Sequence, residues 1–391
     1  MKVVHLCLGC FFPDNYSYQE NMLPKFHKEL GYDVEVIASL ETFDKDGKAT
    51  YMDKAEVYQN EYDIKVTRLN FKNPTKIYKK MKRYVGTYQA IETAKPDILF
   101  IHGCQFQDMD KVVKYIKGHP GVRVYVDHHA DFSNSAKNWM SRHVLHGFFW
   151  KRTAHMVEPY TTKFYGVLPA RVDFLKNIYK LPEEKCELLV MGADDEYVEK
   201  YSSPDSCLDL KKKYNLRTND FVIVTGGKID SFKRQTLLLM EAVRDINDPH
   251  VKLLVFGSIQ DDIRAEFDDL CDGTLVQYLG WANAEQAYMY FSLADLVVFP
   301  GRHSVYWEQA AGQGKPMICK YWDGTTHVDL GGNVEFLYKD SVEEIRQAIQ
   351  SLMSADGERT DKYYSMKKCA AEKGPDVFSY KKIAERSIEC C

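Results

Sequence analysis

The chain has 391 residues, enough for two domains of ordinary size, and its 45% hydrophobic and 28% charged residues are typical of a folded globular protein. Its 52 Lys and Arg residues nearly balance its 56 Asp and Glu residues, giving a formal net charge of -4, so the overall charge argues against nucleic-acid binding. No stretch approaches the roughly 20 apolar residues of a transmembrane helix, and no charged leader precedes the first apolar run, so we expect a cytoplasmic protein.

The first half of the chain predicts a layer of parallel strands and helices. Short apolar runs rich in β-branched residues predict buried strands at residues 3–8, 34–38, 98–102 and 122–127. Between the first two, residues 19–30 have helical spacing and stop at Gly31, a residue suited to a helix end. This alternation is typical of an α/β fold.

The pattern restarts near residue 200. Further strands are predicted at residues 221–225, 253–256, 276–279, 296–299 and 317–320, with helical segments between them. We therefore expect two α/β domains, residues 1–195 and residues 196–375. Ligands of open parallel sheets bind beyond the carboxyl ends of the strands, so the residues that follow each strand are the candidates for a site.

Two glycines and two lysines follow the first strand of the second half. Gly226 and Gly227 would let backbone amides approach an anion closely, and Lys228 and Lys233 could pair with a diphosphate. The alternative is a surface turn with solvated lysines.

A second segment of interest runs from residue 299 to residue 316. A strand ends there, Ser304 is placed to cap a short helix, and Glu308 falls on the first turns of that helix. A buried carboxylate at this place could accept hydrogen bonds from both hydroxyls of a ribose. The alternative is a Glu that only stabilises the helix end.

Several motifs occur in a fixed order along the chain. The glycine–lysine turn is followed by the segments VQYLGW (276–281), ADLVVFP (294–300) and EQAAGQGKP (308–316), and it is preceded by KPDILFIH (95–102) and LVMGAD (189–194). Near the end comes FSY (378–380), followed by Ile383 and Ala384. This ordered set resembles the retaining GT-B glycosyltransferase family 4 over nearly the whole chain.

The resemblance implies a fold and an activity. The fold would be GT-B, with two Rossmann-like domains facing across a cleft and a final helix, residues 376–391, packing back on the first domain. The activity would be transfer of a sugar, with retention, from a nucleotide diphosphate sugar to a carbohydrate or lipid-linked acceptor, as in polysaccharide biosynthesis. The resemblance implies no metal and no cofactor, the nucleotide sugar being a substrate.

The resemblance also assigns residues in the second domain. Lys228 and Lys233 match the basic pair that binds the donor diphosphate, and Glu308 matches the carboxylate near the nucleotide ribose. The other carboxylate of the family's E-x7-E motif is missing, because the position eight residues before Glu308 is Pro300. Arg302 or His303 would occupy that space, so His303 and Ser304 join the candidate donor-binding residues together with Gly226 and Gly227.

The first domain offers a candidate catalytic group. His128, His129 and Asp131 follow the strand at residues 122–127, and a His at a strand end can hold a hydroxyl or stabilise charge in the transition state. The resemblance points to one of the two histidines without selecting it, and Asp131 is the candidate carboxylate near the reacting centre. Alternatively, the two histidines only terminate the strand.

The loop at residues 12–21 lacks the paired glycines that the family places near the donor phosphates. Asn15 and Ser17 are the candidates for phosphate or acceptor contacts there.

The ten cysteines are scattered, and we expect free thiols rather than a zinc site. The acidic pairs of the second half lie in surface contexts and predict no metal site.

Two segments of the first domain, residues 76–84 and 139–152, mix basic and aromatic residues. A helix face of this composition can bind an anionic membrane surface, so peripheral membrane contact is one interpretation of these segments. The alternative, which is commoner, is a helix face exposed to solvent.

Two other functions fit the same architecture. One is a nucleotide-sugar epimerase of GT-B fold, and the other is a catalytically silent nucleotide-binding subunit. Their products distinguish the three: a glycoside, an epimerised nucleotide sugar, or neither.

Overall fold

The computed structural model describes residues 1–44, 48–73, 75, 79, 81–231, 234–354 and 357–389. They form two compact units. The N-terminal unit comprises Met1–Val190 together with the residues from Ile383 onward, and the C-terminal unit comprises Met191–Lys382.

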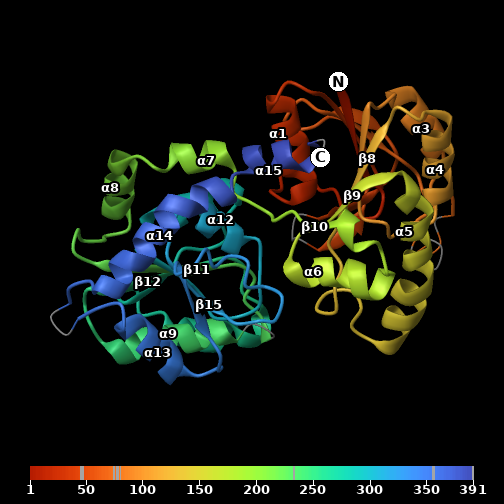
Figure 1. The fold of residues 1–391 in the computed structure, drawn as a ribbon. Coiled ribbons are helices and arrows are strands. Elements are labelled where there is room, and N and C mark those ends of the chain that lie inside the picture. The colour runs from red at the N-terminus through yellow and green to blue at the C-terminus, as the bar shows by residue number, and fades with distance from the viewer. Residues whose placement is uncertain are drawn as a thin grey trace. The chain divides into compact units, whose positions relative to one another are not determined.

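The described part of the N-terminal unit is built on an eight-stranded sheet (Figure 1). All neighbouring strands are parallel except the edge pair β5 and β6. Their spatial order is β10 (Cys186–Leu188), β9 (Thr161–Gly166), β8 (Arg123–His128), β7 (Ile98–His102), β1 (Lys2–Cys7), β2 (Asp33–Ala38), β6 (Lys65–Arg68) and β5 (Val57–Gln59). A separate antiparallel pair consists of β3 (Glu41–Phe43) and β4 (Ala49–Tyr51).

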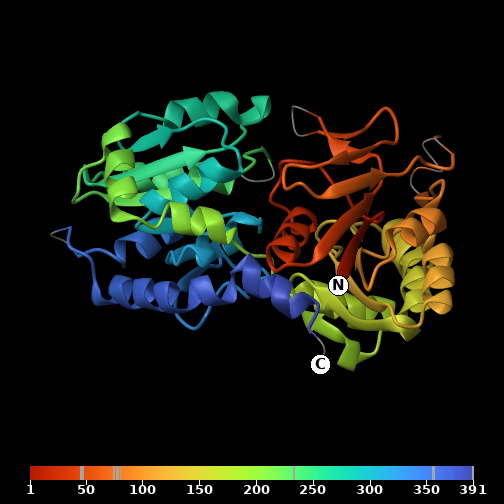
Figure 2. The ribbon, with the colours of Figure 1, turned by 90° about the horizontal axis from the view of Figure 1, so that it is seen from above.

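Helices cover both faces of this sheet, as Figures 1 and 2 show. One face carries α3 (Thr87–Ala94), α4 (Met109–Gly118) and α5 (Lys151–Val157), and the other carries α1 (Gln19–Glu29). The unit also contains α6 (Pro169–Phe174), π-helices Ser141–Trp150 and Leu175–Tyr179, and 3-10 turns Glu158–Tyr160 and Glu183–Lys185.

The final helix, α15 (Tyr380–Ser387), joins the face of the sheet that α1 covers. His27 of α1 lies 3.0 Å from the carbonyl oxygen of Ala384. The hydroxyl of Tyr125 on β8 donates to the carbonyl oxygen of Ile388 at 3.2 Å. The predicted return of the last helix to the first domain is therefore confirmed.

The described residues of the C-terminal unit form a six-stranded sheet in which every neighbouring pair is parallel. The order is β13 (Val276–Tyr278), β12 (Val251–Phe256), β11 (Phe221–Gly226), β14 (Leu296–Phe299), β15 (Met317–Lys320) and β16 (Val334–Leu337). In Figure 1, α9 (Gln235–Ile246) and α13 (Val342–Gln350) lie on one side of it, and α12 (Tyr306–Gly312) and α14 (Asp361–Val377) lie on the other. The remaining elements are α7 (Asp195–Lys200), α8 (Pro204–Lys213), α10 (Arg264–Leu270), α11 (Ala284–Leu293) and the 3-10 turn Asp261–Ile263.

The strand order of each unit reverses at one place. In the N-terminal unit the chain runs outward from β1 in one direction and from β7 in the other, and in the C-terminal unit β11 and β14 play the same parts. The helices that leave such a neighbouring pair cover opposite faces of the sheet, which opens a crevice at the carboxyl ends of the two strands. The fold therefore predicts ligand contacts at these two positions.

Candidate functional site

The C-terminal unit has a hollow at its strand-order reversal. It is formed where β11 and β14 end, and part of its floor is the Gly226 backbone. Its lining residues are Thr225, Gly226, Lys228, Ile229, Thr236, Phe299, Pro300, Gly301, Arg302 and Ser304. The hollow thus joins the two segments that the sequence analysis selected separately.

The glycines of this turn are required by close packing. A Cβ atom on Gly226 would lie 2.3 Å from Cζ of Phe256, and Gly227 has φ 128°, a backbone conformation that side chains disfavour. Gly257, after the neighbouring strand, is packed so closely that its Cβ would lie 1.9 Å from the carbonyl oxygen of Gly227. These glycines are therefore required where the turn after β11 packs against the end of β12 and the residue that follows it.

Basic and hydroxyl side chains line the hollow. The Lys228 side chain is 59% exposed, and its Nζ lies 3.6 Å from the carboxylate of Asp230. Lys233 lies outside the described residues. Ser304 lines the hollow, but it does not cap α12: the helix begins one residue later than predicted, Val305 holds the N-cap position, and no side chain caps it.

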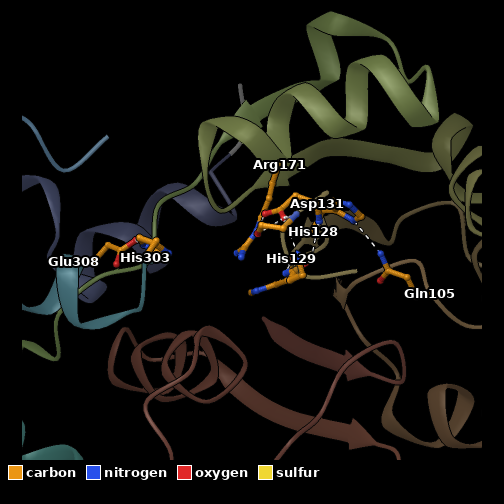
Figure 3. Close-up of polar contacts among 9 residues, drawn as sticks. Gln105, His128, His129, Asp131, Arg171, His303 and Glu308 are labelled. Atoms are coloured by element: carbon orange, nitrogen blue, oxygen red, sulfur yellow. Dashed lines mark hydrogen bonds and ion pairs between the residues drawn. The ribbon is translucent and has the colours of Figure 1, made fainter. Parts of the chain in front are cut away.

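Glu308 lies on the first turn of α12, as the sequence predicted, and it is fully buried. Its Oε1 is 2.8 Å from Nε2 of His303 and 2.8 Å from Nε2 of His327 (Figure 3 labels His303 and Glu308). An imidazole with a hydrogen on Nε2 donates to this oxygen. Two donors on one oxygen fix the plane of the carboxylate.

The other carboxylate oxygen of Glu308 remains available. Oε2 is buried and has no hydrogen-bond partner among the described residues, and the same is true of Nδ1 of His327. Burial alone would raise the pKa of Glu308, but His303 and His327 lower it to about 2. Glu308 is therefore a carboxylate at neutral pH, with one oxygen held and one able to accept hydrogen bonds. His327 was not predicted from the sequence, because it follows β15 in a loop without a recognisable motif.

In the N-terminal unit, successive residues at the end of β8 point to opposite faces of the sheet. His128 packs against the rings of Phe174 and Tyr179, with ring centroids 5.6 Å and 5.1 Å away. Its Nδ1 accepts from the side-chain amide of Gln105 at 3.2 Å (Figure 3). Burial, with smaller contributions from His146 and His129, lowers the pKa of His128 to about 3. His128 is therefore a buried neutral ring.

Asp127 and His129 form a different group. Nε2 of His129 lies 3.2 Å from Oδ2 of Asp127, and Nδ1 of His102 lies 2.7 Å from the same oxygen. The His129 side chain is 26% exposed, whereas Asp127 and His102 are fully buried. Burial alone would lower the pKa of His129, but Glu20 and Asp127 raise it. Of the two adjacent histidines, His129 is the one open to a ligand.

Both carboxylate oxygens of Asp131 have partners, one in its own turn and one on α6. Its Oδ1 accepts from the backbone and the hydroxyl of Ser133, at 2.6 Å and 2.5 Å, and its Oδ2 lies 3.1 Å from Nε of Arg171 (Figure 3). Burial alone would raise the pKa of Asp131, but these contacts lower it. The structure gives Asp131 the observed role of holding the turn after β8 and positioning Arg171.

The loop at residues 12–21 contains no glycine, but one of its residues has a positive φ angle. Asn15 has φ 62°, in the left-handed region that Asn tolerates better than most residues. Its backbone N–H donates to the carboxylate of Glu61 at 2.7 Å, so this amide is already used. Ser17 is half-buried and lies in the same loop.

Two triplets of the described residues bring ligand-type atoms within 4.8 Å of one another: His102, Asp127 and His129, and His303, Glu308 and His327. In both, imidazole nitrogens lie 2.7–3.2 Å from carboxylate oxygens, which are distances of hydrogen bonds and ion pairs. We therefore describe the group around Glu308 as a hydrogen-bonded network, and the group around Asp127 as a hydrogen bond to His102 with an ion pair to His129. The eight described cysteines are free thiols.

The segment 139–152 carries the exposed apolar side chains of the π-helix region. Trp139 is 71% exposed, Met140 67% and Phe148 58%. The segment 76–84 lies partly outside the described residues. Among the helices that the structure describes, none is long and apolar enough to cross a membrane.

No protein-family model matches the sequence, and a search of curated proteins found no match. Solved structures match over almost the whole chain. A glycosyltransferase from Rickettsia africae ESF-5 shares 15% identity over 98% of this chain and 96% of its own, with a TM-score of 0.67. Anabaena Alr3699/HepE in complex with UDP and glucose shares 14% identity over 99% of this chain and 98% of its own, with a TM-score of 0.64.

A UDP-GlcNAc 2-epimerase from Neisseria meningitidis bound to UDP-GlcNAc shares 13% identity over 99% of both chains, with a TM-score of 0.61. Identities this low show a fold and not an activity. The expected fold class is confirmed: the chain is an α/β protein of the GT-B fold, a fold that glycosyltransferases and nucleotide-sugar epimerases share.

Proposed function

We propose that the chain is a glycosyltransferase that moves a sugar from a nucleoside diphosphate sugar to a carbohydrate or lipid-linked acceptor. The observation that carries this proposal is Glu308, a buried carboxylate whose Oε1 is held by two imidazoles and whose Oε2 has no partner among the described residues. The hydroxyls of a ribose are suited to such an oxygen, because each needs an acceptor for its hydrogen.

The hollow at the ends of β11 and β14 is the proposed place of the diphosphate. Gly226 lines the hollow at the end of β11 and Gly227 follows it, so neither residue places a side chain in the path of an anion. The Lys228 ammonium stands at the same turn with most of its side chain in solvent, and Lys233 follows in the sequence. Positive charge there would stabilise the leaving diphosphate as the bond to the sugar breaks.

The N-terminal unit supplies the proposed acceptor side. His129, backed by the ionised Asp127, is the group that we propose to contact the reacting sugar, with retention of configuration and without a metal or cofactor. His128 and Asp131 then act through packing and positioning. Asn15 and Ser17 belong to the loop that would approach the donor phosphates. The exposed Trp139, Met140 and Phe148 are the residues proposed for peripheral contact with a membrane that carries the acceptor.

A second candidate function is epimerisation of a nucleotide sugar. It is favoured by the likeness to a UDP-GlcNAc 2-epimerase, which covers 99% of both chains. An epimerase needs acid and base groups around the sugar, and Glu308 with two histidines is a carboxylate–imidazole group of that kind. Product analysis separates the two, because a transferase gives a glycoside and an epimerase changes the donor itself.

A thermal-shift titration tests the proposal. UDP, GDP, ADP and their sugar conjugates are added to the wild type, to Glu308→Gln and to Glu343→Gln, whose carboxylate is on the surface of the same unit. A nucleotide at 100 times its Kd stabilises the folded state by about 2.7 kcal/mol. We expect one nucleotide diphosphate to stabilise the wild type and Glu343→Gln but not Glu308→Gln. If none does so, the nucleotide-sugar function is wrong.

A further inference from the structure

Three histidines form a continuous buried chain of contacts in the N-terminal unit. Nδ1 of His102 lies 2.7 Å from Oδ2 of Asp127, and Nε2 of His102 lies 2.9 Å from Nδ1 of His5. Nε2 of His5 lies 3.0 Å from Nδ1 of His27, and Nε2 of His27 lies 3.0 Å from the carbonyl oxygen of Ala384. The chain runs from β8 through β7 and β1 to α1 and ends on α15, and the side chains of Asp127 and the three histidines are fully buried.

The number of hydrogens in this chain can be counted. The first group is a carboxylate and the last is a backbone carbonyl, and neither can donate when the carboxylate is ionised. Four contacts therefore need four N–H groups. Three neutral imidazoles have only three, so the chain is complete only with one additional proton.

The count alone does not decide which ring carries that proton, because a second hydrogen on any one of the three rings supplies four N–H groups. The position of the carboxylate decides it. His102 is the ring whose Nδ1 lies 2.7 Å from Oδ2 of the buried Asp127, so an imidazolium there forms an ion pair. With hydrogens on both nitrogens of His102, His5 and His27 are neutral and each donates from Nε2.

One hydroxyl offers the opposite arrangement. Oγ of Ser387 lies 3.0 Å from Nε2 of His27 and could donate to it, which would reverse the direction of every contact and leave all three rings neutral. However, Oγ of Ser387 already donates to the carbonyl oxygen of Ala384 at 2.8 Å. The reversed arrangement also turns the lone pair of His27 toward that carbonyl and leaves the fully buried Asp127 without the imidazolium as a counter-charge, which is costly.

We propose that His5 and His27 are positioning residues that keep His102 an imidazolium at neutral pH, so that Asp127 stays ionised and faces His129. The groups that face His102 are Asp127 on β8, Cys7 on β1, Glu20 and His27 on α1, and His5 on β1. The role of His129 in sugar transfer rests on the proposed function, whereas the charge of His102 does not.

The electrostatics agree with this assignment. Burial alone would lower the pKa of His102, but Asp127, with smaller contributions from Cys7 and Glu20, raises it to about 9. Burial lowers the pKa of His27 to about 4 and lowers that of His5 well below its usual value. The additional proton therefore belongs to the ring beside the carboxylate.

Heteronuclear NMR of the ligand-free protein at pH 7 tests the inference directly, because nitrogen-15 shifts distinguish protonated from unprotonated ring nitrogens. We expect two protonated nitrogens in His102 and a hydrogen on Nε2 alone in His5 and His27. A single hydrogen on Nδ1 in all three rings would overturn the inference. This measurement needs no substrate, so its result is independent of whether the proposed function is correct.

Two variants complete the test. Ser387→Ala removes the hydroxyl that lies next to Nε2 of His27 and is expected to leave both protons on His102. His27→Phe removes the ring that joins His5 to Ala384, so His5 becomes free to donate from Nδ1, and His102 is expected to lose its second proton at pH 7. If Ser387→Ala changes His102, or if a folded His27→Phe does not, the positioning role is wrong.

Discussion

His327 lies 19 residues after Glu308 in the chain, yet its Nε2 is 2.8 Å from Glu308 Oε1. With His303, it occupies one carboxylate oxygen and leaves the other without a partner. The E-x7-E motif of the family that the sequence resembles has two carboxylates eight positions apart, and the position eight residues before Glu308 is Pro300. In this chain the neighbours of the Glu308 carboxylate are two imidazoles.

We expect His327→Phe to weaken nucleotide binding. The variant keeps an aromatic ring but removes one hydrogen bond to a charged oxygen, a contact of about 1.5–3 kcal/mol. The loosened carboxylate should raise the Kd of the nucleotide by about 10-fold or more. Isothermal titration calorimetry measures this Kd. His250→Phe is the control, because the His250 side chain belongs to the same unit and is 41% exposed. An unchanged Kd would show that His327 does not position Glu308.

Mild acid should destabilise the protein through its buried neutral histidines. Burial lowers the pKa of His27 to about 4 and that of His128 to about 3, whereas both titrate near 6.5 when unfolded. A lowered folded pKa means that the unfolded chain binds protons first, so stability is lost as the pH falls below about 6.5. We expect a loss on the order of 2 kcal/mol for each of these histidines between pH 7 and pH 5, measured by urea unfolding. His128→Gln should reduce this slope; an equal slope would contradict the assignment.

Alkaline pH should also destabilise the protein, in this case because His102 loses a proton. Its folded pKa is raised to about 9, so the ion pair with Asp127 contributes its full stability below about 6.5 and loses it as the pH rises through about 9. Unfolding measured from pH 6 to pH 10 should therefore show a decline that Asp127→Asn abolishes. Together with the buried neutral histidines, His102 predicts a stability maximum near neutral pH.

Gly257→Ala should severely destabilise the C-terminal unit. The new Cβ would lie 1.9 Å from the backbone oxygen of Gly227, and φ is +120°. We expect a loss of about 3 kcal/mol or more in the free energy of unfolding, together with loss of the nucleotide-induced thermal shift. Gly273→Ala is the matched control, since its φ is +73° but nothing lies within 4 Å of the added atom. It should cost about 1 kcal/mol and leave nucleotide binding unchanged.

The exposed apolar residues near the π-helix can be tested with vesicles. We expect wild type to co-sediment with vesicles containing anionic lipid and to be released at high salt, because Arg142 and Lys151 flank the aromatic side chains. Trp139→Ser with Phe148→Ser should reduce the bound fraction several-fold, as apolar insertion is lost. Leu208→Ser, an exposed apolar position of the C-terminal unit, is the control. Absence of wild-type binding would contradict the proposed membrane contact.

The sequence predicted most of the parallel strands because they are continuous apolar runs buried on both faces. The runs at 98–102 and 296–299 coincide with β7 and β14. It missed β9, Thr161–Gly166, whose Thr, Lys and Gly residues dilute the apolar pattern. It also placed the start of α12 at Ser304, whereas the chain enters the helix through Val305 without a capping side chain.

The candidate site was predictable only where a motif exists. Glu308 was found from the spacing of its segment, but His327 belongs to a loop whose position depends on tertiary packing. The two faces of β8 were readable from alternation: Asp127 and His128 are adjacent and must point apart. What no local pattern contains is the chain from His102 to His27, because its members come from three separate elements.

The last helix adds a constraint on how the protein is made. His27 and Tyr125 belong to the first third of the chain, and their partners, the carbonyls of Ala384 and Ile388, follow the entire C-terminal unit. During synthesis, domains fold in order as they leave the ribosome. Here most of the N-terminal unit emerges first, but its contacts with α15 cannot form until the last residues have been translated. Its buried histidine chain can therefore be completed only after translation has passed residue 384.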